Sequence, residues 1–149
     1  MTEPMENVDL RSASLMDADD VAALLSALGY PCDREDASER IHSIIANDRQ
    51  AMVLARCDGM VCGLIALDFM YYLPLGTTTC RITAMVVTPE AQGRGLGRQL
   101  LREAERRARV GGAARLEITS GSQRSDAHAF YRACGYSDGT IRFVKHLGC

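Results

Sequence analysis

Three glycines at alternate positions, Gly93, Gly95 and Gly97, stand where a hydrophobic strand meets a helix. The strand stops before Pro89, and from Leu96 onward the apolar residues come at helical spacing. A helix N-terminus exposes unpaired N–H groups and the positive end of the helix dipole. A glycine-rich turn lets the backbone wrap an anion there without interference from Cβ atoms. The stretch therefore predicts a phosphate site, with a plain strand-to-helix turn as the alternative.

Two other phosphate-binding motifs do not fit this stretch. A Walker loop needs a Lys directly after its last glycine, and Arg98 follows Gly97 here. A dinucleotide-binding fingerprint has the spacing G-x-G-x-x-G after a first strand. The spacing here is G-x-G-x-G, with a proline before it.

The elements that must position this loop follow from hydrophobic periodicity and turn signals. Ser14 with Asp17 resembles a capping box at the start of a first helix, which Gly29 ends. Asp58-Gly59 is a strong hairpin signal. The expected order is a strand ending at 10–11, a helix before Gly29, a helix at 36–46, strands at 52–55, 61–69 and 79–87, a helix at 95–110, a strand at 115–119, a helix at 126–134 and a last strand at 140–147.

This order mixes hairpin-linked antiparallel strands with helical crossovers, so the expected fold class is α/β (α+β mixed) with a mixed sheet. The second helix should turn Ile41, Ile44 and Ile45 inward, and residues 71–78 should form a loop. No repeat or linker divides the chain, so residues 1–149 are expected to be a single domain.

Composition narrows the function classes. Apolar residues make up 47% and charged residues 24%, as in ordinary soluble proteins, and the net charge of -2 gives no broad case for nucleic acid or an anionic membrane. The six cysteines are expected to be free, mostly buried thiols in a reducing cytoplasm, since no signal peptide or membrane span is present. No metal site is expected, because Asp126 and His128 would point apart on a helix.

The glycine stretch resembles the pyrophosphate loop of the GNAT superfamily of acyl-CoA-dependent N-acetyltransferases, [Q/R]-x-x-G-x-[G/A], running here from Gln92 to Gly97. A second family element, an aromatic-Tyr pair followed by Gly-aromatic, reads Phe130-Tyr131 and Gly135-Tyr136. The C-terminal quarter is similar to aminoalkylphosphonate N-acetyltransferases, as carried by Arg124, Asp126-Ala127-His128 and Phe130-Tyr131.

The resemblance implies a central, mostly antiparallel twisted sheet with helices on both sides and a V-shaped splay between two central strands. It implies acetyl-CoA as cosubstrate, with the pyrophosphate on backbone N–H groups of the loop and the pantetheine arm paired to the preceding strand. A strand N–H near Val87 would meet the thioester oxygen. The implied cofactor-binding residues are Met85, Val86, Val87, Gln92, Gly93, Arg94, Gly95, Leu96, Gly97 and Arg98.

The candidate general acid is Tyr131, whose phenol could protonate the departing thiolate; the alternative is that it only packs beside Phe130. The assignment of the general base is less direct than that of the acid. Many family members carry a Glu three residues before the position of Val87, where this chain has Ala84. Glu117 is the nearest replacement, and a water chain past Thr83 and Thr119 is the alternative.

Substrate-side residues are expected to come from the first two helices and from the loop between the middle strands, which marks Tyr30 to Cys32 and Phe69 with Tyr71 and Tyr72. The expected reaction is acetyl transfer to a primary amine of a small molecule by direct attack in a ternary complex. A protein lysine or N-terminal acetyltransferase and a non-catalytic acyl-CoA-binding module stay open as alternatives. So does a homodimer.

Overall fold

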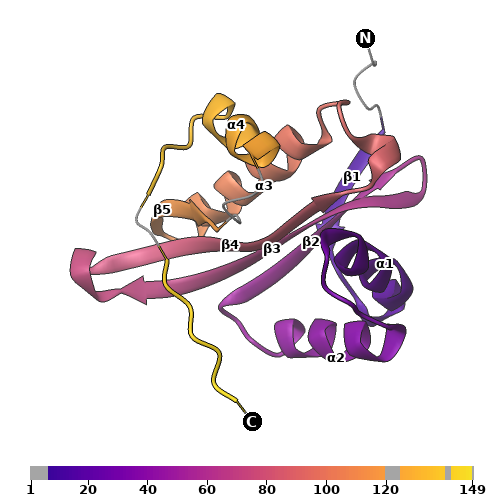
Figure 1. Ribbon diagram of the computed structural model, residues 1–149, viewed down its shortest axis with the longest axis horizontal. Helices are drawn as coiled ribbons and strands as arrows, with labels where there is room; N and C mark the ends of the chain where they lie inside the picture. Colours follow the sequence, from indigo (N-terminus) through magenta and orange to yellow (C-terminus); the bar gives the residue numbers. More distant parts are fainter. Residues whose placement is uncertain (1–6, 120–124, 140–141, 149) are drawn as a thin grey trace. The chain divides into compact units, whose positions relative to one another are not determined.

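The computed structural model describes residues 7–119, 125–139 and 142–148. These fall into two compact units, which divide after Thr119. The first unit is built on a five-stranded sheet in the order β1-β2-β3-β4-β5 (Figure 1). Its first four strands are antiparallel and β5 runs parallel to β4, so the predicted mixed, mostly antiparallel sheet is confirmed. The strands are β1 Val8–Ser12, β2 Gln50–Cys57, β3 Met60–Tyr72, β4 Thr77–Val87 and β5 Ala113–Ile118.

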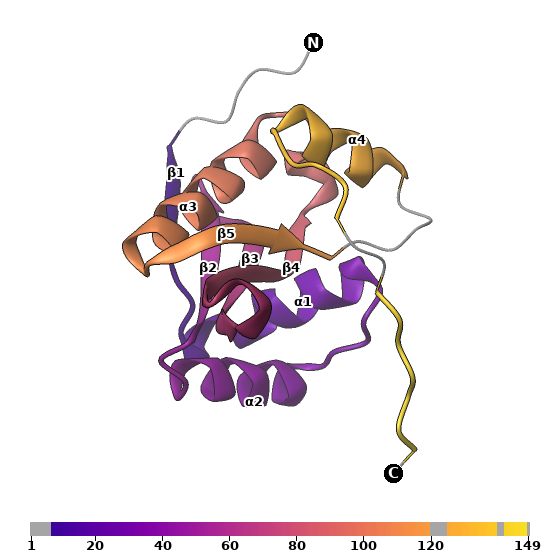
Figure 2. The ribbon, with the colours of Figure 1, turned by 90° about the vertical axis from the view of Figure 1, so that its left-hand side faces the viewer.

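Helices cover both faces of this sheet (Figure 2). On one face lie α1 (Ala18–Leu28) and α2 (Arg34–Ile45), and on the other lies α3 (Leu96–Val110). The first face encloses a core of buried apolar residues that includes Val21, Leu24, Ile41, Met52, Leu54 and Leu64. The buried stripe of α3 is Leu96, Leu100, Leu101, Ala104 and Ala108, and it anchors that helix to the sheet.

Local signals set the helix boundaries much as expected. The Ser14 N–H donates to the Asp17 carboxylate at 2.8 Å before α1, and Gly29 ends α1 at φ +109°. The second helix begins at Arg34, two residues earlier than expected from the apolar pattern, because Asp33 caps it. Ile41 is buried there, but Ile45 is 57% exposed and does not face inward as predicted.

The expected hairpin turn forms between β2 and β3. Asp58 and Gly59 both have positive φ, 53° and 83°, as a type I′ turn requires. Beside the turn, Cys57 and Cys62 are joined by a disulfide, so the expectation that all six cysteines are free is wrong. The hairpin brings these two thiols together across the strand pair, which their spacing in the sequence did not reveal.

Two expected segments differ in the structure. Tyr71 and Tyr72 are not in a loop: they end β3 and pair with Thr78 and Thr77 of β4. The second unit contains α4 (Ser125–Ala133), but residues 142–148 form no strand, and the start of the predicted strand lies outside the described residues. Alternating apolar residues form a strand only where a neighbouring strand supplies hydrogen bonds, so the alternation alone does not determine the element.

Candidate active site

The glycine loop joins β4 to α3 through backbone that only glycine adopts easily. After a 3₁₀ turn at Pro89–Ala91, Gly93 has φ +77° and Gly95 has φ +84°. A Cβ atom added at either glycine would meet no other atom within 4 Å. The protein itself therefore does not crowd this backbone, and the loop is left open to an approaching ligand.

The start of α3 presents a set of backbone donors next to this loop. The Gln99 N–H donates to the Gly95 carbonyl at 3.2 Å. The N–H groups of Leu96, Gly97 and Arg98 precede it, so they have no acceptor within the helix. Together with the helix dipole, they form an environment that favours an anion such as a phosphate.

A glycine in β3 brings α3 close to the sheet. A Cβ added at Gly63 would lie 3.1 Å from the Leu100 Cδ1 atom and 3.3 Å from the Leu96 Cδ2 atom. Both leucines are fully buried, so they hold the first turns of α3 against β3. The donors at the start of α3 are therefore fixed relative to the strands.

Strands β4 and β5 pair over only part of their length. Their pairing ends at Ile82 and Ile118, whereas β4 continues to Val87 and, among the described strands, pairs there only with β3. A register shift between β3 and β4 leaves Thr83 as an extra residue just after the last pair. Within the described residues, one edge of β4 is therefore open immediately before the glycine loop, and the splay expected between two central strands stays a prediction.

The hydrogen-bond alternation of β4 shows which groups face the open edge. The Thr88 N–H donates to the Cys62 carbonyl at 2.9 Å, which makes this a hydrogen-bonded pair. Bonded and non-bonded pairs alternate along antiparallel strands, so Met85 and Val87 direct their N–H and C=O groups away from β3. Gln92 Nε2 donates to the Val87 carbonyl at 3.1 Å. Val86, in contrast, bonds toward β3 and packs on the α1 and α2 core.

The candidate base, Glu117, lies in β5 one residue before the last pair that β4 and β5 form. Arg81 Nε and Nη2 donate to its Oε2 atom at 3.2 and 3.1 Å, and Arg115 Nη2 donates to its Oε1 atom. Both carboxylate oxygens are thus engaged by guanidinium groups. The other position considered, Ala84, is partly buried against the core and offers no titratable group.

The candidate acid, Tyr131, lies in α4 within the second unit. Its ring is 5.6 Å from that of Phe130 and 6.4 Å from that of Tyr136, centroid to centroid. The aromatic packing weighed for Tyr131 is therefore present, and its role as an acid stays a prediction.

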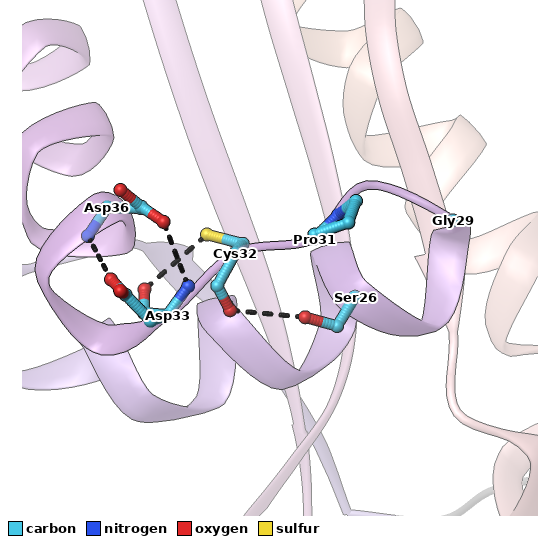
Figure 3. A pocket seen from close by; sticks show the side chains of 6 residues that line it. All are labelled: Ser26, Gly29, Pro31, Cys32, Asp33 and Asp36. Atoms are coloured by element: carbon cyan, nitrogen blue, oxygen red, sulfur yellow. Dashed lines mark hydrogen bonds between the residues drawn. The ribbon is translucent and has the colours of Figure 1, made fainter.

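The predicted substrate residues lie in different places. Tyr30, just beyond α1, is 64% exposed. Neighbouring Pro31 and Cys32 border a shallow pocket of about 550 Å³ between the end of α1 and the start of α2 (Figure 3). Its lining is Ser26, Gly29, Pro31, Cys32, Asp33 and Asp36. Asp33 and Asp36 cap α2 through each other's backbone N–H groups, at 3.1 and 2.8 Å.

Tyr71 and Tyr72 cannot serve one site together, because adjacent strand residues point to opposite faces. The ring of Tyr72 lies under the guanidinium of Arg115, with 4.6 Å from the guanidinium carbon to the ring centroid. Tyr72 therefore belongs to the same cluster as Glu117, whereas Tyr71 does not.

Neither a metal-binding group nor a membrane-spanning helix is found in the described residues. No three His, Cys, Asp or Glu side chains there come together as metal ligands would. None of the described helices has both the length and the apolar character that crossing a bilayer requires.

The family model of the acetyltransferase (GNAT) family matches residues 18–136, which include the open edge of β4, the glycine loop and α4. The chain belongs to the GNAT acetyltransferase family. This GNAT protein is 33% identical over 144 residues to an aminoalkylphosphonate N-acetyltransferase of Salmonella typhimurium, covering 93% of this chain and 91% of the relative. It is 30% identical over 133 residues to an aminoglycoside N(6')-acetyltransferase type 1 of Stenotrophomonas maltophilia, covering 87% and 86%.

The fold of this GNAT protein also matches a solved structure, that of AAC(6')-Iy in complex with the bisubstrate analogue CoA-S-monomethyl-acetylneamine. The TM-score is 0.84 at 16% identity, covering 97% of this chain and 100% of that one. At this identity the likeness concerns the fold alone. The family match and the two curated relatives make the protein a GNAT-type N-acetyltransferase.

Proposed function

We propose that this enzyme transfers the acetyl group of acetyl-CoA to a primary amine of a small molecule, by direct attack in a ternary complex. One observation carries the proposal: the open edge of β4 leads directly into the glycine loop and the free N–H groups of α3. The names of the two curated relatives, an aminoalkylphosphonate and an aminoglycoside acetyltransferase, support a small amine as acceptor.

The residues of this edge and loop fit the donor. Acetyl-CoA supplies an acetyl group activated as a thioester. Backbone N–H groups from Gly93 to Arg98 would hold its pyrophosphate, since this stretch combines open left-handed glycines with unpaired helix donors. The N–H and C=O groups of Met85 would pair with its pantetheine arm as a neighbouring strand does, while the Val87 carbonyl accepts from Gln92. The Val87 N–H is the donor proposed for the thioester oxygen.

Two protons must move for the transfer to balance. The amine nitrogen forms a bond to the carbonyl carbon and loses a proton, while the carbon–sulfur bond breaks and the sulfur gains one. We assign the second proton to the Tyr131 hydroxyl and the first to Glu117 or to water near Thr83. An amine with a pKa near that of Lys is neutral in only about one molecule in a thousand at pH 7, so its ammonium form must lose a further proton to solvent before the attack, and the same route would carry that proton.

The experiment is thiol release from acetyl-CoA across a panel of aminophosphonates, amino acids, polyamines, aminoglycosides and histone-type peptides. Release with a small amine supports the proposal. Release with peptides alone would point to a protein acetyltransferase instead. Tight acetyl-CoA binding without release on any amine would point to a binding module.

A further inference from the structure

Two arginines on neighbouring strands converge on Glu117. Arg81 in β4 and Arg115 in β5 each form an ion pair with it, one on each carboxylate oxygen. The sheet register explains the convergence, because Arg81 pairs directly with Glu117 and Thr79 pairs with Arg115. Arg81 of β4 therefore meets Arg115 and Glu117 of β5 on one face of the sheet.

Arg115 is held rigidly in this cluster. Its Nε atom donates to the hydroxyl of Thr79 at 3.1 Å, and Thr79 is completely buried. Its guanidinium also stacks on the ring of Tyr72. A guanidinium fixed on its Nε edge, on one Nη and on one face loses little freedom when another acceptor arrives.

Each guanidinium keeps one nitrogen for a further partner. Arg81 uses Nε and Nη2, and Arg115 uses Nε and Nη2, so Nη1 of each has no acceptor in the part of the chain that the structure describes. The side chains of Arg81 and Arg115 are 26% and 40% exposed, so the cluster can be reached from solvent. Guanidinium N–H groups in this state match a carboxylate or a phosphonate.

The cluster also lies beside the proposed reaction centre. Arg81 and Glu117 immediately precede Ile82 and Ile118, the last pair that β4 and β5 form. On β3, Asp68 lies directly opposite Arg81. This small patch therefore carries two cations and two carboxylates, a balance that suits a zwitterion better than a polycation.

We infer that Arg81 and Arg115 bind the acidic group, a phosphonate or carboxylate, of a short zwitterionic amine that is the acetyl acceptor. This inference rests on the proposed function and deepens it. It assigns acceptor specificity to two residues that neither the loop motif nor the aromatic motif contains. Glu117, which both guanidinium groups bind, faces the amine end of the same molecule.

The test compares acceptors that differ only in the acidic group: 2-aminoethylphosphonate, 3-aminopropanoate and n-propylamine. The wild-type enzyme should prefer one of the two acids over n-propylamine by at least about tenfold in kcat/KM, and which acid wins identifies the group. Arg115→Gln should lose at least about tenfold on that acid, mostly through KM, and less than about threefold on n-propylamine. Arg115→Lys should lose less than Arg115→Gln, because Lys keeps the positive charge although it lacks the planar set of N–H donors of the guanidinium group.

Arg106→Gln is the matched control, since Arg106 is also ion-paired but lies on α3. It should leave all three acceptors unchanged. An equal loss on acids and n-propylamine in Arg115→Gln, repeated in Arg81→Gln, would overturn the inference and make the cluster merely structural.

A binding measurement separates this inference from the proposed function. Methylphosphonate and acetate carry the acidic groups without an amine, so their calorimetric binding does not depend on acetyl transfer. Binding of one of them to the wild type, weakened at least about tenfold in Arg115→Gln, supports the inference even if no amine is acetylated. Absence of binding for both, with no preference among the acceptors, would overturn it.

Discussion

At the scale of single residues, the proposed function gives three positions different tasks: Gly95 would hold the donor, Tyr131 would protonate the leaving group and Glu117 would face the acceptor. Their surroundings differ sharply. Gly95 has open space beyond its backbone, Tyr131 packs among aromatic rings, and Glu117 is bound by two arginines. Substitutions at the three positions should therefore fail in three distinguishable ways.

Gly95→Val should weaken acetyl-CoA binding by at least about tenfold, or about 1.4 kcal/mol, measured by calorimetry. A branched side chain is strained at φ +84° and would project where the pyrophosphate should lie. Gly112→Val is the matched control, because Gly112 has φ +78° and similar open space but follows the far end of α3. Unchanged affinity in folded Gly95→Val would remove the loop from the donor site.

Tyr131→Phe should lower kcat by about 10²-fold, roughly 2.7 kcal/mol, while the dissociation constant of acetyl-CoA moves far less. The ring and its packing beside Phe130 are kept, and only the hydroxyl is lost. The loss should shrink with an acyl donor whose thiol has a lower pKa, since that leaving group needs less help from an acid. Full kcat in this variant, with chemistry rate-limiting, would show that the acid lies elsewhere.

Glu117→Gln should lower kcat/KM by about 10²-fold and shift the pH–rate profile if the carboxylate takes the amine proton. Its two guanidinium partners must then release an oxygen as the acceptor binds. A loss below about threefold with an unmoved profile would favour the water route past Thr83. In that case Glu117 positions Arg81 and Arg115 without serving as the base.

At the scale of elements, the features that were predicted correctly are those that depend on residues close together in the sequence. The cap before α1, the stop at Gly29 and the Asp58-Gly59 turn depend on contacts a few residues long, and all three are found. The loop glycines were identified in the same way. The disulfide and the arginine cluster were not predicted, because each depends on strand register. Arg81 and Glu117 are separated by 36 positions and meet only through the parallel pairing of β4 with β5.

Two other differences have the same origin. Ile45 follows the helical spacing of Ile41 but is the last residue of α2 and stays 57% exposed. The alternation after residue 140 has the period of a strand, yet residues 142–148 form none. Hydrophobic periodicity shows which residues share one face of a helix or strand. Tertiary contacts determine whether that face is buried.

At the scale of the whole molecule, stability in acid should depend on carboxylates that the fold keeps ionised. Hydrogen bonds from Arg106 lower the pKa of Glu103 to about 2; partial burial opposes this and Arg107 reinforces it. Burial would raise the pKa of Asp17, but hydrogen bonds from Arg11 and Ser14 outweigh it and lower that pKa. A carboxylate with a lowered pKa stabilises the fold above its unfolded pKa and loses this effect as the pH falls.

Glu103→Gln should therefore lower the free energy of unfolding at neutral pH by about 1 kcal/mol. The expected effect is this small because Arg106 is exposed and solvent weakens its ion pair with Glu103. The difference from wild type should shrink as the pH falls from 4.5 towards 2, because unfolded Glu103 is then protonated. Urea denaturation at neutral pH and at about pH 3 measures it. Asp138→Asn is the control, since its pair with Arg132 is exposed. A constant difference at every pH would assign the effect to packing.

Gly63 is expected to affect the proposed donor site through the packing of α3 against the sheet. That glycine lies in β3 and is not expected to touch any ligand, yet its bare Cα sets the spacing between sheet and helix at the point where Leu96 and Leu100 settle. The spacing in turn aims the first N–H groups of α3. The absence of a Cβ at Gly63 is therefore expected to influence the affinity for the proposed acyl donor, although Gly63 lies in β3 and outside the loop. A substitution at Gly63 is therefore a way to change the binding of an acyl donor without changing any residue that is expected to contact the donor.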